Sequence, residues 1–155
     1  MKNRETERKF LVTSTEWKRN SEGVLYRQGY LSTEPGRTVR VRLEGNRGKL
    51  TIKGKKESGS GDEYEYDIPG NDAAYIIDNL CLKPIIEKIR YKVDFKGYTW
   101  EVDEFLKENK GLVIAEIELE SPFQEFEKPA WVGEDVTEDQ RYKNANLVKK
   151  PFMEW

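Results

Sequence analysis

Apolar and polar residues alternate with a period of two along most of the chain, which is the pattern of strands with one buried face. Residues 37–45 read RTVRVRLEG, so aliphatic side chains take turns with charged ones. Residues 112–120 read LVIAEIELE and repeat the pattern with carboxylates. Segments of this kind predict strands over residues 4–12, 37–45, 49–55, 62–68, 85–95, 98–106 and 112–120. Residues 24–32 are mixed in pattern but rich in strand formers, and they complete a set of eight predicted strands.

A few short helices are predicted between and after these strands. Residues 71–80 carry apolar side chains at helical spacing, with Asn71 or Asp72 as the expected cap. Thr137 and Gln140 form a capping-box pattern that predicts a helix over residues 138–147. Residues 121–126 place a proline at the first position of another short helix, and residues 16–19 are expected to form one helical turn.

Strands therefore dominate, and the short turns between them favour antiparallel neighbours. The predicted fold class is α+β, built on an antiparallel sheet with peripheral helices, and eight strands are enough to close a β-barrel. The chain has 155 residues and shows no internal repeat or long linker, so residues 1–155 are expected to form a single domain.

Charge is the unusual feature of the composition. Charged residues make up 36% of the chain, against the ~25% of an average domain. The net charge is only −2, which argues against nucleic acid or an anionic membrane as a partner. No long apolar run predicts a membrane span, and MKNRETERKF has no apolar signal core, so a cytoplasmic location is expected.

The residue types that are scarce also limit the chemistry. The single cysteine, Cys81, excludes an internal disulfide framework, and it is expected to be a packed side chain. The sequence has no histidine, which removes the commonest zinc ligand and general base. Any bound metal is therefore expected to be a hard cation held by oxygen atoms.

The charged faces of the strands sort by sign. Carboxylates dominate in residues 4–12, 62–68, 98–106 and 112–120, whereas Arg and Lys dominate in 37–45, 49–55 and 85–95. Two interpretations stay open at this point. The charges cover the solvated outside of a half-buried sheet, or they line the lumen of a barrel whose apolar faces point outward.

A charged lumen would be costly to fold, since two like charges ~6 Å apart repel by ~3 kcal/mol at an effective dielectric of ~20. Such a lumen would be retained for binding. Basic groups that hold phosphate oxygens, beside carboxylates that hold a divalent metal, are the chemistry of a polyphosphate site. The inward cations would be Lys9, Arg40, Arg42, Lys53, Lys88 and Arg90, and the inward carboxylates Glu5, Glu7, Glu63, Glu65, Asp103, Glu116 and Glu118.

Several segments carry a resemblance to a known family. ETERKF at residues 5–10 is similar to the Glu-x-Glu-x-Lys signature that opens the CYTH superfamily, the triphosphate tunnel metalloenzymes. The chain resembles the short bacterial single-domain members over nearly its whole length. The further matching segments are QGYL (28–31), VRVR (39–42), LTIK (50–53), EYEY (63–66), EKIRYKV (87–93), WEVD (100–103), AEIELE (115–120) and RYKNANL (141–147).

The resemblance implies a closed eight-stranded antiparallel β-barrel, a tunnel with a charged lumen and helices outside. It also implies that a linear triphosphate binds in the tunnel with one or two divalent cations, Mg²⁺ or Mn²⁺. The segment 141–146 is expected to plug one tunnel mouth.

Roles are carried over residue by residue. The implied metal ligands are Glu5, Glu7, Asp103, Glu116 and Glu118, with Glu120 inward at the rim. The implied phosphate clamps are Arg40, Arg42, Lys53, Lys88 and Arg90. Lys9 is expected at a terminal phosphate or the attacking water, and Glu63 and Glu65 serve a second metal, position water or pair with the arginines. Tyr30 is a further catalytic candidate, and Gln28 matches the same segment.

The function expected from this resemblance is a metal-dependent triphosphatase. Inorganic tripolyphosphate is the expected substrate, because a chain this short has no insertion to recognise a nucleoside. The alternatives are a class IV-type adenylate cyclase, a thiamine or nucleoside triphosphatase, and a non-catalytic polyphosphate-binding module; a homodimer also stays open. Trp17, Trp131 and Trp155 are interpreted as packing residues, and Lys55, Lys56 and Glu57 as a solvated loop.

Overall fold

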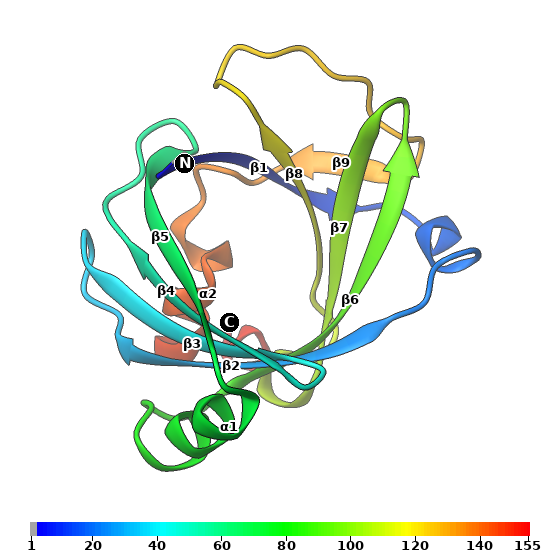
Figure 1. Cartoon of the computed structure of the whole chain (residues 1–155). Helices are drawn as coiled ribbons and strands as arrows, with labels where there is room; N and C mark the ends of the chain where they lie inside the picture. Colours follow the sequence, from blue (N-terminus) through cyan, green and yellow to red (C-terminus); the bar gives the residue numbers. More distant parts are fainter. Residues whose placement is uncertain (1–2) are drawn as a thin grey trace.

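The computed structural model describes residues 3–155, so residues 1–2 of the expected domain 1–155 lie outside the described part. Within it the strands join edge to edge in the order β5-β4-β3-β2-β6-β7-β8-β1, and β1 pairs again with β5. This closes an eight-stranded antiparallel barrel, as predicted (Figure 1). The strands are β1 (Arg4–Val12), β2 (Val24–Ser32), β3 (Thr38–Glu44), β4 (Arg47–Lys53), β5 (Ser60–Ile68), β6 (Ile86–Phe95), β7 (Tyr98–Phe105) and β8 (Val113–Leu119).

One edge of β1 is shared between two partners. Arg4–Thr6 pair with the start of β5, whereas Phe10 and Val12 pair with a short extra strand, β9 (Val132–Asp135). The sequence analysis did not predict β9, since its four residues are too few to show an alternation. Between the two partners, the backbone N–H of Glu7 donates to Gly59 O at 3.0 Å and that of Lys9 to Thr137 Oγ1 at 2.9 Å.

The helices differ from the predicted ones near the C-terminus. Helix α1 (Gly70–Asn79) is close to the prediction, and residues 16–19 hold a 3₁₀ turn at Glu16–Lys18. The helix predicted over 138–147 is wrong in extent: a 3₁₀ turn at Gln140–Tyr142 is followed by α2 (Asn144–Lys149). The physical reason is that Thr137, the predicted cap, bonds to Lys9 of β1 instead.

The helix predicted over residues 121–126 is also wrong. That segment is a turn followed by extended chain, in which Gln124 Oε1 accepts the Glu120 N–H and Phe126 packs edge-on against Phe10 and Trp100. Docking of Phe126 onto the outside of the barrel prevails over the local helix signal. No helix among residues 3–155 is long and apolar enough to cross a bilayer.

The barrel has its apolar faces outside. Helix α1 packs Ala73 and Ile77 against Val41 on the outer face of β3. On the other side, Trp100 and Ile117 of β7 and β8 form a cluster with residues of the segment that follows β8 and with Trp17. Because the apolar side chains of these strands point outward, their charged side chains point into the lumen, and the lumen interpretation is confirmed.

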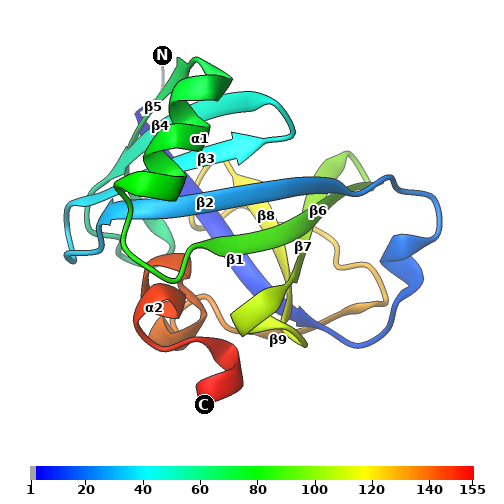
Figure 2. The same ribbon diagram turned by 90° about the horizontal axis from the view of Figure 1, so that it is seen from below.

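One end of the lumen is apolar and closed. Ile86, Phe105 and Ile114 share the inward faces of β6, β7 and β8, and they form a cluster with Leu147 and Val148 of α2. Figure 2 shows α2 lying across this end of the barrel, next to the C-terminus. The expected plug is therefore present, formed by α2 and the residues around it.

Candidate active site in the barrel lumen

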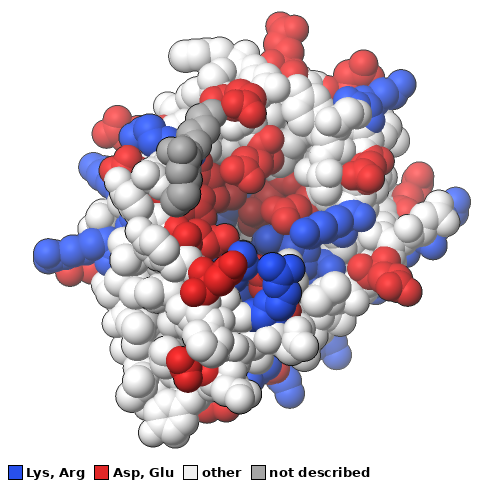
Figure 3. All heavy atoms as spheres, viewed as in Figure 1, with Lys and Arg blue, Asp and Glu red and all other residues white. Residues whose placement is uncertain are grey.

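The charged part of the lumen is a single cavity of about 710 Å³. Figure 3 looks into it along the barrel axis and shows acidic and basic side chains gathered on separate parts of the hollow. Of the site residues predicted from the sequence, all but Asp103 line this cavity: Glu5, Glu7, Lys9, Tyr30, Arg40, Arg42, Lys53, Glu63, Glu65, Lys88, Arg90, Glu116 and Glu118.

A basic wall is formed by β3 and β6, the two neighbours of β2. It consists of Arg40 and Arg42 on β3 and Lys88 and Arg90 on β6, all of them buried. Tyr26 of β2 lies between them, with its ring centre 5.2 Å from the Arg42 guanidinium carbon and 5.0 Å from that of Arg90. These cation–π contacts hold the two guanidinium groups apart on one surface.

Arg40 is the member of this wall with unused hydrogen-bonding capacity. Its Nη2 donates to Thr51 Oγ1 at 3.2 Å, but its Nε is buried and finds no partner in the described structure. A buried guanidinium N–H without an acceptor is costly, so an acceptor such as a phosphate oxygen would be favoured there.

Asp103 is the counter-ion of the other half of the wall. It accepts from Arg90 Nε at 2.7 Å and Nη2 at 2.8 Å, and Lys88 Nζ lies 2.8 Å from its Oδ2. Its burial opposes ionisation, but Arg90 and Lys88 together hold the pKa of Asp103 well below its usual value. This arrangement differs from the expected metal-ligand role, since both oxygens are engaged by cations and Asp103 does not line the cavity.

An acidic wall lies on β1, β8 and β7. Glu7 stands opposite Glu118, and Glu116 stands opposite Glu101, in register on neighbouring strands. Like charges directly across strands are destabilising. Burial, followed by the charge of Glu7, raises the pKa of Glu116 to about 7, and burial with Glu5 raises the pKa of Glu118. Glu101 was missed by sequence reasoning, although it alternates in phase with Asp103.

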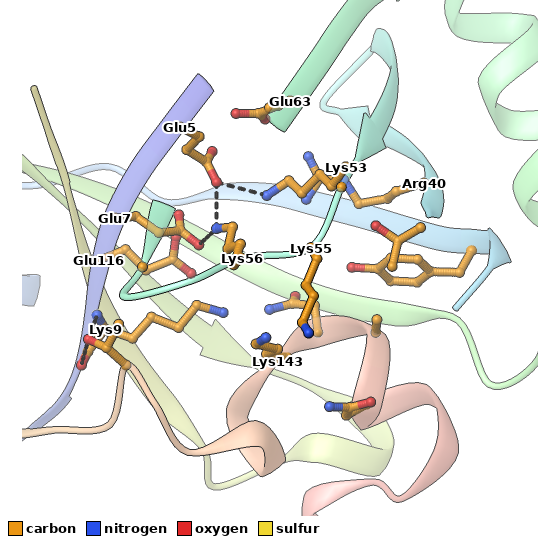
Figure 4. Close-up of a pocket in the computed structure, with 18 of the residues that line it drawn as sticks. Glu5, Glu7, Lys9, Arg40, Lys53, Lys55, Lys56, Glu63, Glu116 and Lys143 are labelled. Atoms are coloured by element: carbon orange, nitrogen blue, oxygen red, sulfur yellow. Dashed lines mark hydrogen bonds and ion pairs between the residues drawn. The ribbon is translucent and has the colours of Figure 1, made fainter. Parts of the chain in front are cut away.

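Lys56 lies between the two carboxylates of β1 (Figure 4). Its Nζ is 2.6 Å from Glu5 Oε1 and 2.7 Å from Glu7 Oε1, and Lys53 Nζ is 3.1 Å from Glu5 Oε1. Burial and Glu7 would raise the pKa of Glu5, but Lys53, a hydrogen bond with Glu63 and Lys56 lower it to about 2. The solvated-loop interpretation is therefore wrong for Lys56, while Lys55 and Glu57 are exposed.

The second acidic pair divides between two roles. Burial and its hydrogen bond with Glu5 raise the pKa of Glu63 to about 8, so this side chain is protonated at neutral pH. Glu65 lies 3.7 Å from Arg40 Nη2 and 3.9 Å from Arg42 Nη2. Three roles were left open for these two residues: holding a second metal, positioning water, or pairing with the arginines. The contacts of Glu65 correspond to pairing with the arginines.

The plug contributes polar groups to the same cavity. Asn144 Oδ1, at the start of α2, accepts from Gln28 Nε2 at 2.9 Å and from Lys88 Nζ at 3.1 Å. Lys143 precedes it and lines the cavity, and burial, Lys9 and Lys56 lower its pKa. Lys143 was missed by sequence reasoning, because nothing local distinguishes it from a solvated lysine.

The carboxylates fit a divalent cation by donor type. Within residues 3–155 no group of three or more acidic side chains is already arranged as a metal site. Every donor on the acidic wall is nevertheless a carboxylate oxygen, as Mg²⁺ and Mn²⁺ prefer. Lys56 pairs with Glu7 and Arg90 lies 3.3 Å from Glu101, whereas burial and neighbouring carboxylates raise the pKa values of Glu116 and Glu118, whose negative charge a cation would neutralise.

Comparison with known proteins agrees with this geometry. The CYTH domain model matches residues 3–152. The chain is 53% identical to the inorganic triphosphatase of Acetivibrio thermocellus, with 96% of each chain covered. It is 36% identical to the inorganic triphosphatase of Nitrosomonas europaea, covering 93% of this chain and 96% of the relative. A crystal structure of an inorganic triphosphatase superposes with a TM-score of 0.65 at 33% identity, over 92% and 96% of the two chains.

Proposed function

This chain belongs to the CYTH domain family, and from that premise we propose that it is a divalent-metal-dependent inorganic triphosphatase. The observation that carries the proposal is the division of one cavity, closed at one end, into a basic wall and an acidic wall. A basic wall alone would suit an anion-binding module. The acidic wall also needs positive charge to offset its carboxylates, and a divalent cation bound together with a polyphosphate would supply it.

The names of the relatives support the choice of reaction and substrate. Both relatives are inorganic triphosphatases, and the more similar one matches over 96% of both chains. The alignment leaves no room in this chain for a large additional recognition segment. A cavity lined mainly by charged side chains suits a substrate that is itself only phosphate.

The basic wall would bind and orient the substrate. Inward side chains two residues apart lie ~7 Å apart along a strand, and β3 and β6 are two strand spacings apart, about 10 Å. Arg40, Arg42, Lys88 and Arg90 thus cover an area long enough for a linear triphosphate rather than a single phosphate. Binding at several points fixes the chain of phosphates in line for attack at its terminal phosphorus.

The acidic wall would hold the metal. Glu5, Glu7, Glu116 and Glu118 are the residues that would coordinate Mg²⁺ or Mn²⁺, which when bound neutralises charge on phosphate oxygens and on the leaving group. Since the sequence has no histidine, a proton from the attacking water would leave to a carboxylate or to solvent. Little base strength is needed where the phosphoryl transition state is loose.

The test is phosphate release from tripolyphosphate, ATP and thiamine triphosphate with Mg²⁺ or Mn²⁺, with cyclic AMP measured in parallel. We expect hydrolysis of tripolyphosphate to dominate and to stop in EDTA. Dominant cyclic AMP formation, or turnover unaffected by EDTA, would contradict the proposal.

A matched pair of arginine variants tests the site. Arg40→Gln removes a buried clamp whose Nε is unpartnered, and we expect tripolyphosphate binding to weaken roughly 10- to 150-fold. Arg37→Gln removes an exposed arginine paired with Glu34 just before the same strand, and it should leave binding unchanged. Equal effects of the two variants would remove the clamp assignment.

A further inference from the structure

The loop between β4 and β5 inserts one of its lysines among the carboxylates of β1. Lys56 Nζ makes two short charge-assisted hydrogen bonds, to Glu5 at 2.6 Å and to Glu7 at 2.7 Å, and its side chain is only 16% exposed. Lys55, next to it in the same loop, is exposed. The cationic group of Lys56 therefore occupies the space between two carboxylates that the proposed function assigns to a metal (Figure 4).

The backbone of the loop is anchored so that Lys56 is presented there. Glu57 and Ser60 exchange backbone hydrogen bonds of 2.7 and 2.9 Å, which closes a tight turn just after Lys56. Gly59 O accepts from Glu7 N at 3.0 Å, and Ser60 Oγ lies 2.6 Å from Thr6 Oγ1. The turn is thus fixed to β1 beside Glu5 and Glu7.

We propose that Lys56 is a tethered counter-ion of the metal site, which neutralises Glu5 and Glu7 in the metal-free protein and is displaced when a divalent cation binds. The inference rests on the proposed function, because it takes these carboxylates as metal ligands. Lys56 and a divalent cation compete for the same oxygen atoms, so both do not hold them at once. The displaced ammonium stays in a cavity shared with the basic wall, where a bound polyphosphate would offer it oxygen acceptors.

Competition of this kind has a measurable consequence for metal binding without substrate. Lys56→Gln removes the competitor, so Mn²⁺ alone should bind on the order of 10- to 100-fold more tightly than to the wild type. Lys55→Gln removes the same charge from the same loop but no ion pair with Glu5 or Glu7, and it isolates the general electrostatic effect. Mn²⁺ affinity is read by electron paramagnetic resonance or calorimetry with no phosphate present.

The wild-type protein provides a second measurement that does not depend on a variant folding. Labelling of lysine amines with an acylating reagent, resolved by tandem mass spectrometry, should increase several-fold at Lys56 when Mg²⁺ saturates the protein. Labelling of Lys55 should stay the same, because its amine is exposed with or without metal.

Either of two results would overturn the inference: Mn²⁺ affinity of Lys56→Gln no higher than that of Lys55→Gln, or Lys56 labelling unchanged by saturating Mg²⁺. The proposed function fails separately, if the wild type does not hydrolyse tripolyphosphate in a metal-dependent manner. If the wild type needs metal for turnover but its Lys56 labelling is unchanged, the proposed function stands and only the counter-ion role of Lys56 is rejected.

Discussion

Two buried acidic residues of neighbouring strands have opposite electrostatic surroundings. Asp103 is fully buried and neutralised by Arg90 and Lys88, at distances of 2.7 to 2.8 Å. Glu116 is nearly as buried, and burial with the charge of Glu7 raises its pKa to about 7 although Lys9 stands opposite it on β1. The same change, carboxylate to amide, should therefore have different effects on stability at the two positions.

Asp103→Asn should lower the free energy of unfolding by about 3–5 kcal/mol, because it leaves buried Lys88 without its carboxylate and buried Arg90 with Glu101 alone, 3.3 Å from its Nη1. Urea unfolding at pH 8 in EDTA measures the loss. Glu116→Gln is the matched comparison, and it should cause little or no loss, since burial and Glu7 already disfavour the charged form of Glu116. If Glu116→Gln destabilised the protein as much as Asp103→Asn, the acidic wall would be a structural network rather than a site with surplus charge.

At the residue scale, the sequence predicted which side chains enter the lumen but not how they pair. Alternation is a property of each strand, so Arg40 or Glu118 could be placed inward from local pattern once a barrel was assumed. The pairing of Asp103 with Arg90 depends on the register between β6 and β7, which no single strand reveals. Lys56 lies outside any strand, and its inward direction is set by a turn fixed to β1.

At the element scale, the loop before β5 depends on one glycine. Gly59 has φ +81°, and a Cβ atom there would lie 2.6 Å from the backbone O of Glu7. Gly97, in the turn between β6 and β7, has nearly the same φ of +84° but open space around it. Substitution of Gly97 therefore measures only the cost of a left-handed conformation, whereas substitution of Gly59 adds the cost of a collision with β1.

Gly97→Ala should cost about 1 kcal/mol of unfolding free energy, as expected for alanine at positive φ. Gly59→Ala should cost about 1–3 kcal/mol more, because the collision forces the turn away from β1. Thermal or urea unfolding of both variants gives the difference. Equal losses would show that the loop is not fixed against Glu7, and would weaken the argument that Lys56 is held in place.

The elements that sequence reasoning placed wrongly are those whose ends depend on distant contacts. The strands were located well because period-two alternation extends over seven or more residues in most of them, and because residues 24–32, where the pattern is mixed, are rich in strand-forming side chains. The helix expected over 138–147 was shortened because Thr137 bonds to Lys9, 128 residues away in sequence, instead of capping a helix. The helix expected over 121–126 gave way to the packing of Phe126 against Trp100.

At the scale of the whole molecule, buried carboxylates in the lumen make the free energy of unfolding depend on pH. Burial and neighbouring carboxylates raise the pKa of Glu116 to about 7, and burial with the bond to Glu5 raises that of Glu63 to about 8. Both values lie above the 4.5 of the unfolded chain. The folded protein thus holds more protons than the unfolded one between pH 4.5 and 8, so its stability must fall as pH rises through this range.

We expect the free energy of unfolding in EDTA to decrease from about pH 5 to pH 8, with a slope of up to about 1.4 kcal/mol per pH unit for each group. Glu5, whose pKa is lowered to about 2, acts in the opposite sense and removes stability only below about pH 4.5. Lys88, whose pKa burial lowers to about 8, adds a rising contribution only above pH 8. The decline is therefore confined to the range in between, where urea unfolding at half-unit pH steps measures it.

Two controls assign this decline to the lumen. The double variant Glu63→Gln, Glu116→Gln keeps both side chains uncharged at every pH, so its decline in EDTA from pH 5 to 8 should be reduced to the part that Glu118, whose pKa is also raised, contributes. Saturating Mg²⁺ should also abolish the decline in the wild type, because a cation on the acidic wall favours the deprotonated carboxylates that repel one another without it. A wild-type profile that is already flat in EDTA would mean that Glu63 and Glu116 are ionised at neutral pH. In that case Glu63 would not share a proton with Glu5, and the acidic wall would carry no surplus negative charge.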